Sequence, residues 1–230
     1  MEVMGIYGEA GIGTDAIELI EVAGRTCYKS ESKITESSAR KFVSSILSMG
    51  HESVIEHSAM TVKFIVDRGV THELVRHRLC AFSQESTRYC NYKGGVTFVI
   101  PPWTTLEEGE WNQVGNAILP IRNGLTITEA AFMYTKPDQQ NFLSLLLKCE
   151  KAYQSLLVNG WPPQQARSVL PNSLKTEIVV TANFREWRHI FKLRTSKAAH
   201  HQMREIMIPL LAECKRMIPV IFDDIEPNGN

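Results

Sequence analysis

Two strand-like segments lie far apart in a chain whose other periodic segments are helical, and this arrangement restricts the possible folds. Residues 60–66 place apolar side chains at every second position, the pattern of a strand that buries one face. Residues 176–182 are rich in β-branched residues and form the second strand candidate. Strands and helices do not alternate regularly along the chain, so a repeated βαβ fold is disfavoured and an α+β protein is expected.

Several further segments have the apolar spacing of helices. One helix is expected after Thr14 and Asp15, which can cap its first turn. The other helices are predicted from Thr35 to Gly50, from Phe142 to Gly160, and at residues 70–79, 163–170, 184–193 and 201–218. A third, short strand is expected at residues 96–100. Residues 103–140 have no clear period, and we expect them to form a variable, partly helical insertion.

Glycine-rich nucleotide motifs are absent from the sequence. Neither G-x-G-x-x-G nor G-x-x-x-x-G-K-[ST] occurs, so a Rossmann domain and a P-loop NTPase are both disfavoured. A nucleotide cofactor would therefore have to be held in another way. No segment has the composition of a linker, and we expect residues 1–230 to form a single domain.

The charges of the chain balance, with 25 basic and 25 acidic residues. This balance argues against a protein whose whole surface neutralises the phosphates of a nucleic acid. The sequence shows neither a long apolar run nor a basic-then-apolar start, so a cytoplasmic protein without a membrane partner is expected. The 5 cysteines are scattered and include no C-x-x-C, which favours reduced thiols over a zinc ribbon, and no metal is expected.

The densest chemical information lies in an R-H-R tripeptide, Arg76 to Arg78, followed after seven residues by Ser86. Residues 68–94 contain five basic and two acidic residues, and residues 183–204 contain six and one. Arginine offers a planar fork of donors that suits phosphate and carboxylate. An isolated R-H-R tripeptide is commonly only a solvated helix face, but these two basic segments favour binding of phosphorylated ligands.

The string RHRLCAFSQESTRY, at residues 76–89, resembles the signature of the flavin-dependent thymidylate synthases. Further motifs are similar to that family in the same order along the chain: HESVIEH at 51–57, QARSVLP at 165–171, NFR at 183–185 and LRT at 193–195. The resemblance implies a non-Rossmann flavin-binding fold, with a mixed sheet flanked by helices.

The same resemblance implies the activity. Such an enzyme methylates C5 of dUMP to give dTMP, with methylenetetrahydrofolate as carbon donor, FAD as redox carrier and NADPH as reductant. It uses no cysteine nucleophile and forms a homotetramer whose subunits share active sites. A related flavin-dependent methylase or hydroxymethylase acting on UMP or dUMP remains an alternative.

Site residues follow from the matched motifs. The resemblance implies that FAD is bound by Ser53, Glu56, Arg76, His77, Arg78, Asn183, Arg185 and His189. It implies that dUMP is bound by Glu73, Gln84, Glu85, Ser86, Arg88, Arg167 and Arg194. Arg194 would face the uracil ring, and Arg194, Ser86 and His51 are the expected catalytic residues. Of the histidines at 200 and 201, one is expected to make a contact and the other to be exposed.

Three other functions for these residues are disfavoured by the sequence. HESVIEH looks like the H-E-x-x-H motif of zinc hydrolases, but His51 and His57 are six residues apart, whereas zinc ligation on one helix face needs four. Arginines interleaved with Phe82 and Tyr89 could bind RNA or single-stranded nucleic acid, which the zero net charge disfavours. A thiolate nucleophile at Cys80, close to the basic motif, is also disfavoured.

Glu73 departs from the family pattern, because relatives can carry glutamine at the position that touches the substrate phosphate. A carboxylate beside a phosphate is repulsive unless it is paired. We expect a partner for Glu73, for example His77 one turn further along the chain.

Overall fold

The computed structural model describes residues 2–7, 16–114, 117–122, 125–126 and 136–227. The chain divides into two compact units. The first comprises Met1–Ile65, Val70–Gln84 and Glu177–Asn230, and the second comprises Val66–Gly69 and Glu85–Thr176. The single domain expected from the sequence stays a prediction.

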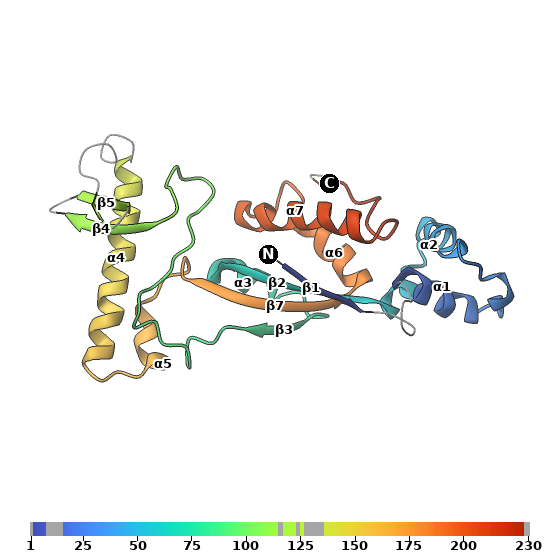
Figure 1. Ribbon diagram of the computed structural model, residues 1–230, viewed down its shortest axis with the longest axis horizontal. Helices are drawn as coiled ribbons and strands as arrows, with labels where there is room; N and C mark the ends of the chain where they lie inside the picture. The colour runs from blue at the N-terminus through green and yellow to red at the C-terminus, as the bar shows by residue number, and fades with distance from the viewer. Residues whose placement is uncertain (1, 8–15, 115–116, 123–124, 127–135, 228–230) are drawn as a thin grey trace. The chain divides into compact units, whose positions relative to one another are not determined.

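The first unit is built on a four-stranded sheet with the order β1-β2-β7-β3 (Figure 1). Its strands are β1 (Glu2–Tyr7), β2 (Ala59–Asp67), β3 (Ala81–Gln84) and β7 (Lys175–Asn183). β1 pairs with β2, and β3 with β7, in antiparallel registers. β2 and β7 are joined by a hydrogen bond of 2.7 Å between the hydroxyls of Thr61 and Thr181. The α+β class is confirmed. Of the sheet's neighbouring strands, the β1–β2 and β3–β7 pairs are antiparallel.

Helices complete the first unit. They are α1 (Ala16–Thr26), α2 (Ser38–Ser48), α3 (Arg68–Leu74), α6 (Phe184–Arg194) and α7 (His201–Met217), with 3₁₀ helices η1 (Glu31–Lys33) and η2 (Glu52–His57). The indole of Trp187 on α6 donates a hydrogen bond of 2.9 Å to the carbonyl of Met60 on β2. The Sγ atom of Cys214 on α7 lies 3.6 Å from the Sδ atom of the same Met60. Both helices therefore pack on β2, and their buried side chains form the core.

Several predicted elements of this unit are confirmed, and others are corrected. β2, β7, α6 and α7 match the expected segments, whereas the capping residues Thr14 and Asp15 lie outside the described residues. Within the HESVIEH motif, residues Glu52–His57 form the 3₁₀ helix η2. The helix predicted at residues 70–79 is shorter and ends at Leu74. The sequence did not predict strand β3. This strand has only 4 residues and none of them is fully buried, so it lacks the alternation of buried apolar and exposed polar residues that indicates a strand.

The second unit contains a long helix, α4 (Pro137–Val158), with α5 (Pro163–Ala166) and η3 (Arg167–Val169) after it. α4 contacts an antiparallel sheet of β4 (Glu110–Val114), β5 (Ala117–Arg122) and β6 (Leu125–Thr126). α4 ends ahead of Gly160, whose φ of +87° is a conformation that glycine adopts freely. The predicted α4 and the helical segment after it are confirmed.

Residues 103–140 hold more strand than the sequence predicts. Their described residues contain β4, β5 and β6, because the pairing of neighbouring strands overrides the weak local pattern, and residues 137–140 begin α4. That this segment is a variable insertion stays a prediction. The strand expected at 96–100 is reduced to one bridge, between Phe98 and Leu174. Pro101 follows directly and cannot donate a hydrogen bond to continue it.

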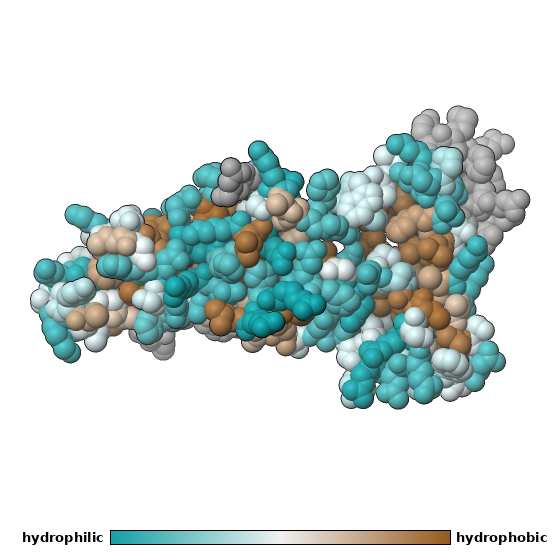
Figure 2. Space-filling view, turned by 180° about the vertical axis from the view of Figure 1, so that it is seen from behind, coloured by the Kyte–Doolittle hydropathy of each residue, from teal (hydrophilic) through white to brown (hydrophobic). Residues whose placement is uncertain are grey.

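Figure 2 shows, on one face of the molecule, hydrophobic residues in separate areas among hydrophilic ones. In the described part of the chain, no helix combines the length and the apolar character needed to cross a bilayer.

Candidate functional site

The R-H-R motif lies in a turn, not on a helix. The backbone N–H groups of Arg76 and His77 bond to the carbonyls of Glu73 and Leu74, three residues back, so the α-helical ladder has ended. The turn points the three side chains differently: His77 is buried, with 5% exposure, while Arg76 and Arg78 are exposed. Among the described residues, neither exposed guanidinium has a hydrogen bond or an ion pair, so both can bind an anion.

Arg194, at the end of α6, is anchored by contacts to two residues. Its Nε donates to His77 Nε2 at 3.0 Å, and its Nη1 donates to Glu73 Oε2 at 2.8 Å. Its Nη2 also donates to the backbone carbonyl of Glu73, at 3.2 Å. Three contacts from two elements hold the guanidinium in one orientation. The partner expected for Glu73 therefore exists, but it is Arg194 and not His77.

His77 is neutral in this arrangement. Its Nε2 accepts the hydrogen bond from Arg194 and so carries no proton, which places the single proton on Nδ1. Burial, helped by the charges of Arg194 and His189, lowers the pKa of His77 to about 4. Nδ1 faces Glu186 Oε1 at 3.6 Å. Burial raises the pKa of Glu186, and His189 opposes that shift.

His77, Glu186 and His189 approach one another closely enough to be considered as a metal site. Their possible ligand atoms lie within 4.8 Å of one another. The Arg194 guanidinium, however, donates to one nitrogen of His77 and places a positive charge beside the group. This charge disfavours a bound cation. The histidines of the rejected zinc motif, His51 and His57, are exposed and are not part of this group.

The residues predicted to bind FAD all lie in the first unit, and contacts connect several of them. η2, which carries Ser53 and Glu56, contacts α6. Arg185 of α6 donates to Glu56 Oε1 at 2.6 Å, and both side chains are substantially exposed. Asn183 caps α6 by accepting a hydrogen bond of 2.9 Å from the backbone N–H of Glu186. The His189 ring meets the His77 ring edge-on, with 6.0 Å between centroids.

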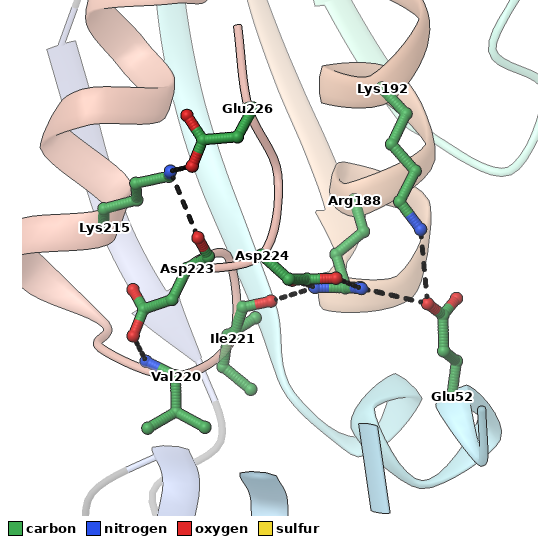
Figure 3. A network of polar contacts seen from close by, with 9 residues as sticks. All are labelled: Glu52, Arg188, Lys192, Lys215, Val220, Ile221, Asp223, Asp224 and Glu226. Atoms are coloured by element: carbon green, nitrogen blue, oxygen red, sulfur yellow. Dashed lines mark hydrogen bonds and ion pairs between the residues drawn. The ribbon is translucent and has the colours of Figure 1, made fainter. Parts of the chain in front are cut away.

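Arg188 is a residue of this region that the sequence interpretation missed. Figure 3 shows its guanidinium between Asp224 and Ile221 on one side and Glu52 on the other. It forms a paired contact with the carboxylate of Asp224, at 2.5 and 2.7 Å, and lies 3.1 Å from Glu52. The side chain is only 3% exposed. In the sequence Arg188 is one of several arginines in a basic segment, and nothing there distinguishes it.

The residues predicted to bind dUMP are divided between the units. Glu73, Gln84 and Arg194 belong to the first unit, where Gln84 donates to the Thr71 hydroxyl at 3.0 Å. Glu85, Ser86, Arg88 and Arg167 belong to the second.

In the second unit, three of these residues lie in or next to one short turn. The Ser86 hydroxyl accepts a hydrogen bond of 3.3 Å from the Arg88 backbone N–H. Arg167 donates to the hydroxyl of Thr87 at 2.9 Å. Ser86 and two exposed arginines, Arg88 and Arg167, thus share one surface of this unit. They offer a hydroxyl and two guanidinium groups, the donors that a phosphate requires.

The side chain of Glu85 is engaged elsewhere. It accepts a hydrogen bond of 2.8 Å from the hydroxyl of Tyr92, and it lies 3.3 Å from the ammonium of Lys175. Both contacts are made by the carboxylate, so the side chain of Glu85 already has partners within the protein. Burial raises the pKa of Tyr92, and the hydrogen bond to the Glu85 carboxylate raises it further.

Cys80 is unsuited to nucleophilic attack. Burial, together with the nearby Glu186 charge, raises its pKa to about 12. The thiol is therefore protonated at neutral pH, and the thiol form is a poor nucleophile.

Comparison with known proteins gives a consistent family. The family described as "Thymidylate synthase complementing protein" matches residues 13–220. A protein of Geobacter sulfurreducens named "Flavin-dependent thymidylate synthase" is 32% identical over 216 residues, which cover 90% of this chain and 81% of the relative. Proteins of the same name from Mycobacterium tuberculosis H37Rv and Corynebacterium aurimucosum are each 33% identical, covering 90% and 96% of this chain and 79% and 84% of the relatives.

Proposed function

The chain belongs to the family of flavin-dependent thymidylate synthases, and from this premise we propose that it methylates C5 of dUMP to give dTMP. The one-carbon donor in this proposal is methylenetetrahydrofolate, and the reductant is NADPH. We further propose that the enzyme acts in the cytoplasm as a homotetramer with shared active sites.

The residues of the first unit fit a flavin dinucleotide. The exposed guanidiniums of Arg76 and Arg78 have no protein partner among the described residues, and FAD carries two phosphates that such groups bind well. Asn183, Arg185 and His189 lie on or next to the first turns of α6, and Ser53 and Glu56 lie on the contacting η2. These residues would hold FAD. When bound, FAD supplies hydride transfer between the reductant and the pyrimidine.

The fixed guanidinium of Arg194 is the observation that carries the proposal. A pyrimidine ring that accepts a hydride or loses a proton develops negative charge on its carbonyl oxygens. A guanidinium that is already oriented by His77 and Glu73 stabilises such charge without first reorganising. Arg194 would therefore act on the uracil ring, while His51 would lie at the entrance of the site.

The phosphate of dUMP is assigned to the second unit. Ser86, Arg88 and Arg167 supply the donors, and the backbone near Glu85 and the side chain of Gln84 would complete the nucleotide site. Glu73 would lie near the substrate as the partner of Arg194. Their ion pair neutralises the carboxylate, which would otherwise repel an anionic substrate.

Anaerobic turnover tests the proposal directly. Purified protein is incubated with FAD, NADPH, methylenetetrahydrofolate and either dUMP or UMP, and the product is identified by mass. We expect dTMP from dUMP, with tetrahydrofolate and NADP⁺ as co-products, because NADPH supplies the two electrons that reduce the transferred methylene. Product from UMP alone, or a hydroxymethylated product, would replace dUMP methylation with the related activity. A colourless protein that does not quench added FAD fluorescence would contradict the flavin assignment.

A further inference from the structure

A buried carboxylate next to the Arg194–His77 pair has no role in the proposed reaction. We infer that Glu186 is a positioning residue, which holds His77 in the tautomer that can accept from Arg194 and thereby keeps the Arg194 guanidinium in place. The inference about catalysis rests on the proposed function, whereas the inference about the tautomer does not.

Geometry gives the first step. His77 Nε2 lies 3.0 Å from Arg194 Nε, and an arginine nitrogen can only donate. A proton on His77 Nε2 would therefore face another N–H group. The contact is attractive only when the proton of the neutral imidazole sits on Nδ1.

The second step concerns the other ring nitrogen. A negative charge beside Nδ1 favours a proton there. Glu186 Oε1 lies 3.6 Å from Nδ1, which is within ion-pair range but too long for a hydrogen bond, and the two side chains are only 5% and 7% exposed. The carboxylate thus favours the proton on Nδ1 through its charge and leaves Nε2 to accept from Arg194.

Other charged and titratable groups around the ring do not take over this role. Arg194 occupies Nε2, and Glu73 is engaged by the Nη atoms of Arg194. His189 meets the His77 ring edge-on, and Cys80 is a protonated thiol that feels the same Glu186 charge. None of these groups places a negative charge at Nδ1.

Glu186 also has a structural alternative that the test must separate. It is three residues after the helix cap Asn183, where glutamate commonly stabilises the first turn of a helix. A role limited to the helix start would change stability but not the tautomer of His77.

The test observes the imidazole itself. The full-length protein is labelled with ¹⁵N-histidine, and the His77 signals are identified by their loss in His77→Gln. We expect wild-type protein at pH 7 to show a protonated Nδ1 and an unprotonated Nε2. Glu186→Gln and Glu186→Leu both remove the charge, so both should shift His77 toward the other tautomer. Glu186→Leu should also lower kcat about tenfold with a smaller change in KM.

The control is Glu213→Gln, which removes an exposed carboxylate of α7 and should change neither signal nor kcat. A wild-type His77 protonated on Nε2 would overturn the inference even if Glu186→Leu failed to fold. An unchanged tautomer in a folded Glu186→Leu protein would also overturn it. Because the signals are read without substrate, absence of dTMP formation would refute the proposed function alone.

Discussion

At the scale of single residues, Arg194 has the most defined chemistry. Its side chain is 20% exposed and is held by contacts to His77 and Glu73, so its energetic effect should appear mainly when charge develops on the ring. We expect Arg194→Ala to lower kcat about 100-fold while the Kd of the nucleotide changes much less. Steady-state kinetics combined with equilibrium nucleotide binding separates the two effects. A variant that loses only affinity would reduce Arg194 to a binding contact.

His77 makes stability depend on pH, and the sign follows from its lowered pKa. The unfolded chain binds a proton below the ordinary value of 6.5, whereas folded His77 resists protonation until about pH 4. Between these values the unfolded state binds more protons, so stability falls as pH falls, by about 3 kcal/mol in total. Above pH 6.5 His77 is neutral in both the folded and the unfolded chain, so the stability no longer changes with pH through this residue.

The prediction is tested by denaturant unfolding at pH 4.5, 5.5, 6.5 and 7.5, at one protein concentration, with wild type and His77→Gln. The variant should lose this part of the pH slope. Glu186 complicates the wild-type curve, because a raised carboxyl pKa makes stability fall with rising pH just above its usual range. The difference between the two proteins isolates His77, and equal slopes would contradict a buried neutral imidazole.

At the scale of elements, Arg188 joins α6 to η2 and to the segment that follows α7. Its guanidinium is buried, and removing it would deprive the Asp224 carboxylate and the Ile221 carbonyl of this donor and leave Glu52 with Lys192 as its remaining cation. Because Asp224 is 58% exposed, water would compensate it in part. We expect Arg188→Ala to lower the free energy of unfolding by about 2–3 kcal/mol.

The matched control for Arg188 is Lys192→Ala, which removes the other cation near Glu52. That ammonium is 51% exposed, so the change should be below about 0.5 kcal/mol. Because η2 carries residues of the proposed flavin site, Arg188→Ala should also weaken FAD binding in a fluorescence titration. Equal small effects of both substitutions would show that the network contributes little.

The elements also show what could be predicted from the sequence. β2, β7, α4 and α6 have strong periodic patterns that their tertiary contacts reinforce, and all were predicted. β4 and β5 were not, because their stability comes from pairing with each other rather than from local propensity. The R-H-R motif stands out in the sequence, but the helix predicted at residues 70–79 includes the motif, whereas α3 ends at Leu74, before it.

The partners within the site were less predictable than its members. The Arg194–Glu73 pair joins residues 121 positions apart, and no local pattern encodes that contact. Arg188 was missed for the same reason, since its partner Asp224 lies on another segment. Which arginines are free and which are paired is decided by the fold.

At the scale of the whole molecule, the zero net charge, from 25 basic and 25 acidic residues, conceals a segregated charge distribution. The basic segment 183–204 has its own acidic partners: Arg185 with Glu56, Arg188 with Asp224, and Arg194 with Glu73. These pairs neutralise much of the local charge that the sequence alone suggests. The guanidiniums of Arg76 and Arg78 are exposed instead. Anion binding in the first unit should therefore depend on these two more than on the larger basic count of 183–204.

The last prediction concerns the division of binding between the two units. The residues assigned to FAD lie in the first unit, whereas Ser86, Arg88 and Arg167 lie in the second. We expect Arg78→Ala to weaken FAD binding about tenfold, the effect of one lost charge-assisted contact, while nucleotide affinity stays near wild type. Ser86→Ala and Arg88→Ala should weaken nucleotide binding by a similar factor and leave FAD occupancy unchanged.

Flavin absorbance after purification and fluorescence titration measure FAD binding in each variant, and equilibrium dialysis measures the nucleotide. Arg40→Ala is the matched control, because Arg40 is an exposed arginine of α2 outside both sets and should affect neither ligand. Parallel loss of both ligands in all three variants would mean that the substitutions act through folding or assembly. Selective loss is expected instead, because no described contact of Arg78 involves Ser86 or Arg88, and substitutions at independent sites act separately.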